Sequence, residues 1–458
     1  MSTPADASIP SGLPPSATAQ PNEPIIIPGR WRKLAAVAGA LLADNNEIGV
    51  LSTLAPVIVK ALALQLSAVG VLVSVSKAIG IVFGPVWAWI ARKTNRKTAL
   101  VVATFMVALL TAATGLAQSY GQLLLIWSCA AVFIAAGLPI VSEITSDLFD
   151  EKSRGRANGY TWGTIALTGS ILAPLFGQLS RIENGWRYGF FISGGIGLLV
   201  TIAIIVVFKD PGIGAAEPAL RDLTAAERAE ASKLSWERVR QLVRIPTFLL
   251  MLGQRLMSGH LLVGTFGILF LVNAYGFTTA VASVVTLPFG IGYLVGTFGG
   301  GLVVDAIQAR LPRIGRIVVL QAAQFGFAAA AIIGTQIHWG GIAIFAVFWF
   351  LMGMMQGVNP GVNRPIVMAV VPPELRGAAF ALMLSVFEGL AFIIFNLSAG
   401  FLSQTFGLKT VMLYIPGFLM ILNGLYCSFL YRTYPRDVDA LQSLLQDRDQ
   451  AAVRQHGN

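Results

Sequence analysis

Two carboxylic acids lie near the middle of the first long apolar segment of the chain. Glu47 follows Asp44 by three residues, so a helix would place both side chains on one side. An ionisable group at the centre of a bilayer costs about 2.5–3.5 kcal/mol on the mildest scale and usually faces a cavity or a partner. Two acids this close in a low-dielectric medium cannot both ionise easily. The pair predicts proton coupling, and a structural pairing with Lys77 of the second segment is the alternative.

Further ionisable residues interrupt later apolar segments. Arg255 and Arg364 lie in the seventh and tenth segments. An arginine in a cavity can hold a phosphate or carboxylate group through two parallel hydrogen bonds. It can equally form half of a static ion pair with Glu388 or Glu143. We predict a substrate-binding site that contains Arg255, Arg364, Glu388, Lys77 and Glu143. The sequence shows no metal-ligating set.

The segments that carry these residues are long and hydrophobic. The chain has 458 residues, of which 55% are hydrophobic and 12% charged, and its mean hydropathy is +0.72. Blocks of about 20 apolar residues match the length of a helix that crosses about 30 Å of hydrocarbon. Because lipid offers no hydrogen bonds to the backbone and the blocks do not alternate, we expect helices. We predict an all-α integral membrane fold with twelve transmembrane helices, at residues 33–59, 66–91, 98–117, 122–146, 158–180, 188–208, 246–274, 280–304, 316–335, 340–370, 376–402 and 409–431.

A polar stretch in mid-chain separates two sets of six segments. Its later part, from Leu223 to Val243, is charged and helix-prone, and predicts an amphipathic helix at the membrane surface. The first 29 residues lack Lys and Arg and are rich in Pro, Ser and Ala, as in a disordered tail. The predicted domains are a tail (1–29), an N-terminal six-helix bundle (30–208), a linker (209–245), a C-terminal six-helix bundle (246–431) and a second tail (432–458).

The basic residues predict the orientation of the segments. With the N-terminus inside, the inner loops and tails hold 25 Lys and Arg residues, whereas the outer loops hold four. Such an excess marks the cytoplasmic side. We expect both termini in the cytoplasm and, from the compact loops, a bacterial inner membrane. This placement explains the net charge of +10 without a nucleic-acid partner.

The two halves contain an internal repeat. SRGRANGY, from Ser153, is matched by LRGAAFAL, from Leu375; GPVWAWIARKTNRK, from Gly84, corresponds to GTFGGGLVVDAIQAR, from Gly296. This six-plus-six pattern resembles the major facilitator superfamily. The resemblance implies two bundles with pseudo-twofold symmetry that rock around a cavity at mid-membrane. It implies a secondary transporter that works by alternating access.

The loop motif is similar to the signature of that superfamily, roughly G-x-x-x-G-x-L-A-D-R-x-G-R-R. Arg92 stands where the family has Asp, while the second half keeps the acid as Asp305. The resemblance implies salt bridges between the bundles that hold one side closed. In the first half, Glu143 or Asp147 could supply the acid; the alternative is that these loops only enforce topology. The predicted gating residues are Arg92, Lys93, Arg96, Asp147, Arg154, Asp305, Arg310 and Arg376.

Three further phrases resemble the Spinster-like lipid transporters. ADNNEIGVL, from Ala43, is similar to I-D-R-x-x-x-x-x-V-L, with Asp44 on the coupling aspartate and Asn45 in place of the arginine. ITSDLF, from Ile144, resembles I-x-D-L-F, and DPGIGAAEPAL resembles D-P-x-R-G-A-A-E. The Gly-Glu pair of the family is missing from the fourth segment, where Glu143 is a nearby acid. The resemblance implies a proton-coupled carrier of lysophospholipid or sphingoid-type amphiphiles.

Other functions remain as alternatives at this point. Proton-coupled efflux of drugs or other hydrophobic compounds is one, and uptake of a small organic anion is another. An ATP-driven pump would need a phosphate-binding loop, and the chain has no Gly-Lys pair. We do not expect an enzyme, because three histidines and two cysteines form no catalytic constellation. The expected partners are an amphiphilic substrate, protons and membrane lipids, with a monomeric chain and no cofactor beyond the proton gradient.

Overall fold

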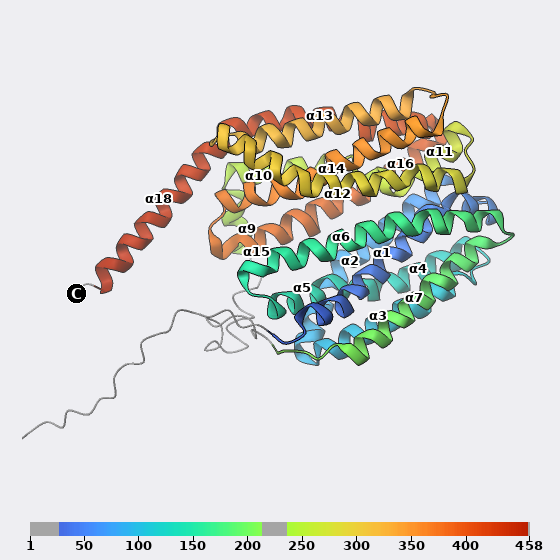
Figure 1. Cartoon of the computed structure of the whole chain (residues 1–458), viewed down its shortest axis with the longest axis horizontal. Helices are drawn as coiled ribbons and strands as arrows, with labels where there is room; N and C mark the ends of the chain where they lie inside the picture. Colours follow the sequence, from blue (N-terminus) through green and yellow to red (C-terminus); the bar gives the residue numbers. More distant parts are fainter. Residues whose placement is uncertain (1–26, 213–235, 457–458) are drawn as a thin grey trace, which may run out of the picture.

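The computed structural model describes residues 27–212 and 236–456, and all regular structure within them is helical (Figure 1). Short 3₁₀ and π turns join several helices, most of them near the chain's last two spans. The helices are α1 (Arg30–Ala61), α2 (Leu66–Lys93), α3 (Arg96–Thr114), α4 (Tyr120–Ile134), α5 (Gly137–Leu148), α6 (Glu151–Gln178), α7 (Gly185–Val207), α9 (Trp236–Val243), α10 (Pro246–Leu256), α11 (Leu261–Tyr275), α12 (Thr279–Arg310), α13 (Gly315–Gln336), α14 (Ile342–Val370), α15 (Arg376–Phe380), α16 (Glu388–Met412), α17 (Leu419–Tyr426) and α18 (Leu430–His456).

The predicted transmembrane helices are all present. Ten helical segments of the described chain are long and apolar enough to cross a membrane. One of these, Arg376–Asp447, contains the last two predicted spans, which are separated at Gly407, where φ is +76°. α6 is not among the ten, but it coincides with the fifth predicted span. The all-α membrane fold with twelve spans is therefore confirmed.

Two of the predicted spans are broken rather than continuous. The fourth is divided into α4 and α5, and the seventh into α10 and α11. At the second break, Gly259 packs so closely on the carbonyl of Ile415 that a Cβ would overlap it. The Asn423 side chain donates hydrogen bonds to the carbonyls of Gln254 (3.1 Å) and Met257 (3.0 Å). These bonds satisfy carbonyls that the interrupted helix leaves without partners.

The helices form two bundles, with α1–α7 in one and α10–α17 in the other (Figure 1). Within the first bundle, α7 packs against α1 and α3, and within the second, α12 and α13 pack against α14. The bundles meet mainly along two helix pairs, α2 with α16 and α6 with α12. Figure 1 shows α6 and α12 side by side at the centre of the molecule.

At one end the bundles are in close contact. This closed end carries the α1–α2 connection and the residues between α11 and α12. Gly70 of α2 lies against the carbonyl of Asn396 in α16, and Gly400 lies against the backbone of Ser67. Two hydrogen bonds from Gln404, to Gln65 (3.2 Å) and to Ser67 (2.6 Å), also join the halves. Small residues let the two backbones approach closely, which is how membrane helices pack.

The opposite end, the open end, carries the α2–α3 and α12–α13 connections. Here the buried apolar clusters of the two bundles are separate, one built around Trp87 and Phe149 and the other around Phe248 and Val367. At the closed end, one cluster mixes residues of both bundles. Among the described residues, every ion pair at the open end lies within one bundle. The structure is thus closed at one end and parted at the other.

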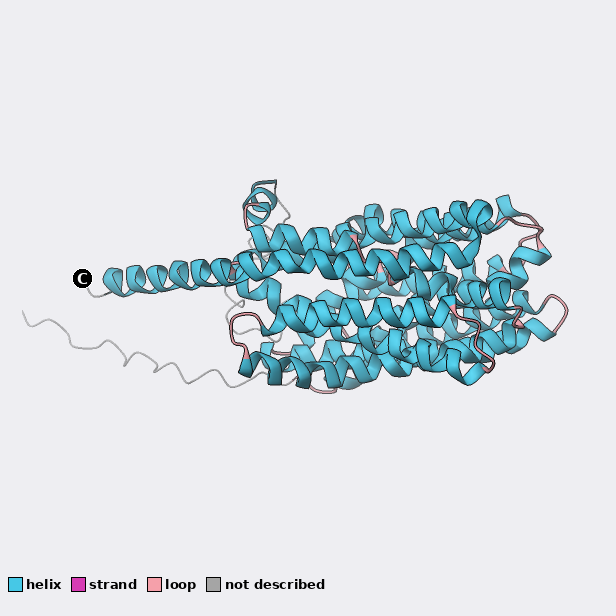
Figure 2. Ribbon diagram, turned by 90° about the horizontal axis from the view of Figure 1, so that it is seen from above, coloured by secondary structure: helices cyan, strands magenta, loops and turns pink. Residues whose placement is uncertain are grey.

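The segments outside the bundles are only partly described. α18 continues the last span through the predicted C-terminal tail and extends beyond the bundles at the open end (Figures 1 and 2). The predicted surface helix from Leu223 to Val243 falls mostly outside the described residues, which include its end as α9. Leu242 of α9 is buried in the apolar cluster of the C-terminal bundle.

Candidate transport site

The predicted proton-coupling acids are both buried, but they face different neighbours. Asp44 is 6% exposed and lies against Gly137, at the start of α5, where a Cβ would overlap its carboxylate. Glu47 is fully buried and accepts a 2.8 Å hydrogen bond from the hydroxyl of Thr111 in α3. The break between α4 and α5 therefore lets a glycine approach one acid, while α3 holds the other.

Polar neighbours of these acids fix the position of α1. Asn46 donates a 2.8 Å hydrogen bond to Ser193 of α7, so two side-chain hydrogen bonds tie α1 to α7 and α3, while Asp44 packs against α5. Asn45 is exposed and turns its side chain back to the carbonyl of Leu41. The position where Spinster-like sequences carry an arginine thus holds an uncharged side chain.

Among the described residues, no ion pair joins Lys77 to the acids of α1, and its side chain lies against residues of α16. Its ammonium group lies 5.8 Å from the ring centroid of Phe392 in α16. Its side chain also packs beside Gly389 and lies near enough to Glu388 to interact with it electrostatically. The lysine is on α2, so this contact joins the two bundles.

Arg255 forms the ion pair that the sequence offered as one of two alternatives. Its Nη1 atom lies 3.6 Å from Glu388 Oε2, and the guanidinium is 6% exposed against 28% for the carboxylate. Arg255 Nε is buried and has no hydrogen-bond partner among the described residues. The arginine comes from α10, just before the broken part of the seventh span. The break brings the buried His260 close to it.

Arg364 and Tyr293 complete the group around Glu388. Arg364 is exposed on α14, and Tyr293 of α12 lies within electrostatic range of Glu388, Arg364 and Arg255. We call Lys77, Arg255, Arg364 and Glu388 the cavity charge cluster. Three of its members are basic and one is a carboxylate, so the cluster carries a formal excess of two positive charges.

Glu143 was predicted in the substrate site, but the structure places it in an ion pair at the open end. Arg92 donates to Glu143 Oε1 over 2.8 Å from its Nε atom, and its Nη2 atom also contacts that oxygen. The neighbouring Arg96 binds both Asp147 and Asp210, the latter at 3.1 Å. Glu143 and Asp147, the acids that the sequence offered for the first half, thus form ion pairs with its arginines. Both pairs, however, lie within the N-terminal bundle.

The other predicted gating residues take different places. Asp305 and Arg310 are exposed and form no ion pair with another described residue. Arg376 donates to the carbonyls of Met368 (2.9 Å) and Val371 (3.3 Å), so it caps the end of α14. Lys93 lies 4.7 Å from the ring centroid of Trp89. The side chain of Arg154 falls outside the described residues.

Three residues of the site escaped the sequence analysis. Thr111, Tyr293 and Asp210 each contact a predicted site residue or lie close to one. A hydroxyl in an apolar helix is common, so Thr111 carried no signal. Tyr293 could have been noticed, because it is a polar aromatic residue in the glycine-rich middle of the eighth span. Asp210 sits in the family-like phrase that follows the sixth span.

Comparison with known families decides what kind of bundle this is. Residues 36–335 match the family described as Major Facilitator Superfamily. The chain belongs to the Major Facilitator Superfamily. Its two-bundle fold is thus that of a multi-pass membrane transporter, a class whose members are not enzymes.

Solved superfamily structures share the fold over most of the chain. A bacterial homolog of the human lysosomal transporter Spinster, in an inward-facing and occupied conformation, has 19% identity and a TM-score of 0.71. The match covers 90% of this chain and 98% of that one. The D-xylose-proton symporter has 16% identity and a TM-score of 0.66, over 87% of this chain and 96% of that one. The predicted superfamily is confirmed, and the fold is similar to that of the Spinster homolog.

Curated superfamily members match shorter stretches. Multidrug resistance protein 3 of Bacillus subtilis is 27% identical over 139 residues, which are 30% of this chain and 27% of that protein. The hexuronate transporter of Escherichia coli is 22% identical over 182 residues, or 40% of this chain and 42% of that protein. The chain thus matches less than half of the length of either relative.

Proposed function

We propose that this superfamily member is a proton-coupled carrier of lysophospholipid or sphingoid-type amphiphiles that works by alternating access. The cavity charge cluster is the observation that carries the proposal. The cluster has three basic side chains and one carboxylate. Two of the basic side chains, those of Lys77 and Arg364, are exposed. Such a site suits a ligand with a phosphate group. Arginine binds phosphate through paired hydrogen bonds, and lysine adds a point charge.

The cluster is shared between the halves, which gives a route from binding to movement. Lys77 belongs to α2, whereas Arg255, Arg364 and Glu388 belong to the C-terminal bundle. A headgroup that contacts both sets would draw the bundles together at the open end. Exposed apolar side chains nearby, such as Leu390 (41% exposed) and Ile394 (51% exposed) of α16, can receive a hydrocarbon chain.

Protons would enter through Asp44 and Glu47. Burial disfavours the charged form of any carboxyl group, so an acid that moves between a wet and a dry environment gains and loses a proton. Asp44 contacts the α4–α5 break through Gly137, and a shift of α5 would change its surroundings directly. Glu47 lies deeper and is held by Thr111. Asp44 is therefore the proposed coupling acid, with Glu47 as its electrostatic partner.

The proposed orientation places the open end in the cytoplasm of a bacterial cell, since that end carries the excess of Lys and Arg. Both termini would then lie inside, and the structure would correspond to an inward-facing state. We propose a monomer driven by the proton gradient.

The deciding experiment is flux of a fluorescent lysophospholipid in proteoliposomes, with and without a pH gradient. We expect flux in the wild type to depend on the gradient and to collapse in Asp44→Asn. Glu183→Gln, which alters an exposed acid at the closed end, serves as the control. Gradient-independent flux, or unchanged coupling in Asp44→Asn, would contradict the coupling assignment.

A second candidate is transport of a small organic anion. The positive excess of the cavity charge cluster and the named hexuronate and galacturonate relatives favour it. Efflux of hydrophobic drugs is a third, favoured by the Bacillus multidrug relative. If a folded protein moved hexuronate but no lysophospholipid, the lipid assignment would be wrong while the cluster's role would stand. Transport of a substrate without an anionic group would argue against both the lysophospholipid and the organic-anion assignments.

A further inference from the structure

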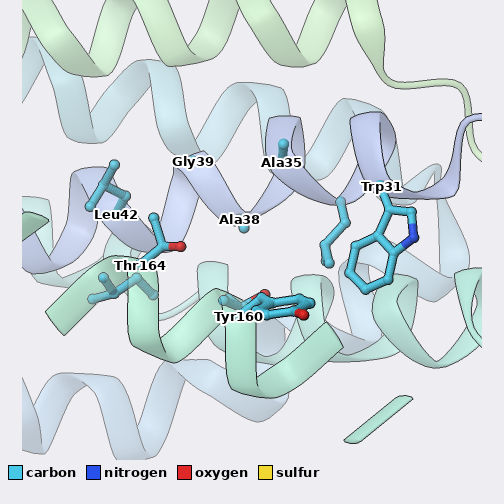
Figure 3. A pocket seen from close by; sticks show the side chains of 10 residues that line it. Trp31, Ala35, Ala38, Gly39, Leu42, Tyr160 and Thr164 are labelled. Carbon is cyan, nitrogen blue, oxygen red and sulfur yellow. The ribbon is translucent and has the colours of Figure 1, made fainter. Parts of the chain in front are cut away.

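A groove on the surface of the N-terminal bundle lies between α1 and α6 (Figure 3). It has a volume of about 210 Å³, and most of its lining is apolar. The rings of Trp31 and Tyr160 stand at one end, while Leu42 and Thr164 lie toward the other (Figure 3). Ala35 and Ala38 form its floor, so small side chains create the hollow. No residue of the cavity charge cluster contributes to it.

The exposure of α6 shows that this groove opens toward lipid. The face of α6 that contacts α12 carries Gly163, Ser170 and Gly177. Tyr160 and Thr164 lie on a different face, which continues toward the closed end with large exposed residues at spacings of three or four. These are Leu167 (41% exposed), Ile171 (50%) and Leu175 (60%). Such a stripe on a membrane-spanning helix faces hydrocarbon, and the groove is part of the same surface.

The length of the groove matches one lipid chain. Trp31 and Leu42 are eleven residues apart on α1, which is roughly 17 Å at 1.5 Å per residue. One leaflet contributes about half of a hydrocarbon core that is about 30 Å thick. A single acyl chain of the leaflet at the open end would therefore run the full length of the groove.

Two arginines are close in sequence to the aromatic residues at this end of the groove. Arg32 follows Trp31, and Arg156 precedes Tyr160 by one helical turn, on the same face of α6. Both side chains are exposed, and neither forms an ion pair with another described residue. Trp and Tyr mark the level of lipid headgroups in membrane proteins. The two arginines therefore lie where the phosphate of a bound lipid would be.

We propose that this groove is a binding site for an anionic membrane phospholipid, with one acyl chain along α1 and α6 and its phosphate on Arg32 and Arg156. The lipid is a resident ligand rather than cargo. The site does not depend on the proposed transport function, because it lies on the outer surface of one bundle. Its floor is the helix that also carries Asp44.

The test uses the full chain in phosphatidylcholine nanodiscs that contain a minority of brominated lipid. Bromine quenches tryptophan, and the signal of Trp31 is obtained by subtracting the spectrum of Trp31→Phe. We expect brominated phosphatidylglycerol to quench Trp31 at much lower mole fractions than brominated phosphatidylcholine. Arg32→Gln or Arg156→Gln should each reduce that preference roughly fivefold, whereas Arg181→Gln, at the closed end, should not.

A second variant fills the groove without changing charge. Ala38→Phe should abolish the quenching of Trp31 by phosphatidylglycerol, while Ala329→Phe, at an exposed position of α13, should leave it intact. Equal quenching by both lipids would overturn the proposal. So would a phosphatidylglycerol preference that survives in Ala38→Phe. If Ala38→Phe failed to fold, the arginine variants would still decide, because their side chains are exposed.

Discussion

Thr111 donates a 2.8 Å hydrogen bond to one carboxylate oxygen of Glu47, while the other oxygen, Oε1, is buried without a hydrogen-bond partner among the described residues. A membrane-embedded acid is thus held by a single hydroxyl from a neighbouring helix. This contact connects α1, which carries both predicted coupling acids, to α3. The acid is fully enclosed in the N-terminal bundle, which separates it from the cavity charge cluster.

We first predict that Thr111→Val destabilises the protein by about 1–3 kcal/mol. The change removes the one hydrogen bond described for the buried carboxylate of Glu47. Glu47→Gln should be milder, since an amide oxygen can still accept from Thr111. Thermal unfolding in detergent measures both. Thr104→Val is the matched control, because Thr104 is buried on the same helix and has no side-chain hydrogen bond among the described residues. Equal losses in both threonine variants would contradict the role of this bond.

The second prediction concerns the charges at Glu388. Glu388→Gln leaves the buried Arg255 without its carboxylate, and the loss should cost about 1–3 kcal/mol, since the acid is partly exposed. The same change raises the positive excess of the cluster, so the affinity for an anionic ligand should increase. Ligand-dependent shifts in melting temperature measure the second effect. Glu183→Gln, at an exposed position of the closed end, should do neither.

The third prediction is that Lys77→Gln lowers the affinity for an anionic ligand, whereas Glu388→Gln raises it. Removing one exposed positive charge from the cluster should weaken the binding of an anionic headgroup roughly fivefold, because one charge in a partly wet site contributes about 1 kcal/mol. Stability should change little. A binding titration with lysophospholipid and with its uncharged monoacylglycerol analogue separates the charge effect from the loss of packing. An equal loss for both ligands would exclude a headgroup contact.

The fourth prediction tests the closed end. In Gly70→Ala the new Cβ would overlap the carbonyl of Asn396, so the bundles must separate at this end. In a Cys129→Ser background, a cysteine placed by Ser74→Cys should then react several-fold faster with a thiol reagent added from that side. Ser74 is 2% exposed and contacts the carbonyl of Ile393 across the bundles. Gly80→Ala, which adds its Cβ to open space on the same helix, should leave the labelling rate unchanged.

Periodicity and composition were enough to predict the spans, because a bilayer demands apolar helices of nearly fixed length. They could not predict the breaks at residues 135–136 and 257–260. Those breaks depend on contacts from other helices, such as Asn423 with the carbonyls of Gln254 and Met257. Hydropathy registers side chains one at a time and carries no information about these partners.

Site residues were predictable when their charge was anomalous in lipid. Arg255 and Glu388 were found in this way, and they form a pair. The sequence could not distinguish a cavity residue from a loop residue near the end of a span, which is why Glu143 was misplaced. In the structure Glu143 forms an ion pair with Arg92 at the open end. The roles in gating and proton coupling stay predictions.

The described contacts that join the two halves at the closed end are all between neutral groups: glycine against backbone, Gln404 with Gln65 and Ser67, and Ser74 with a carbonyl. The ion pairs described at the open end each lie within one bundle. Among the described residues, the charges that face each other across this seam are those of Lys77 and Glu388, which lie within electrostatic range of one another. The rate of parting the closed end should therefore depend only weakly on ionic strength, whereas the affinity for a charged substrate falls as salt screens the site.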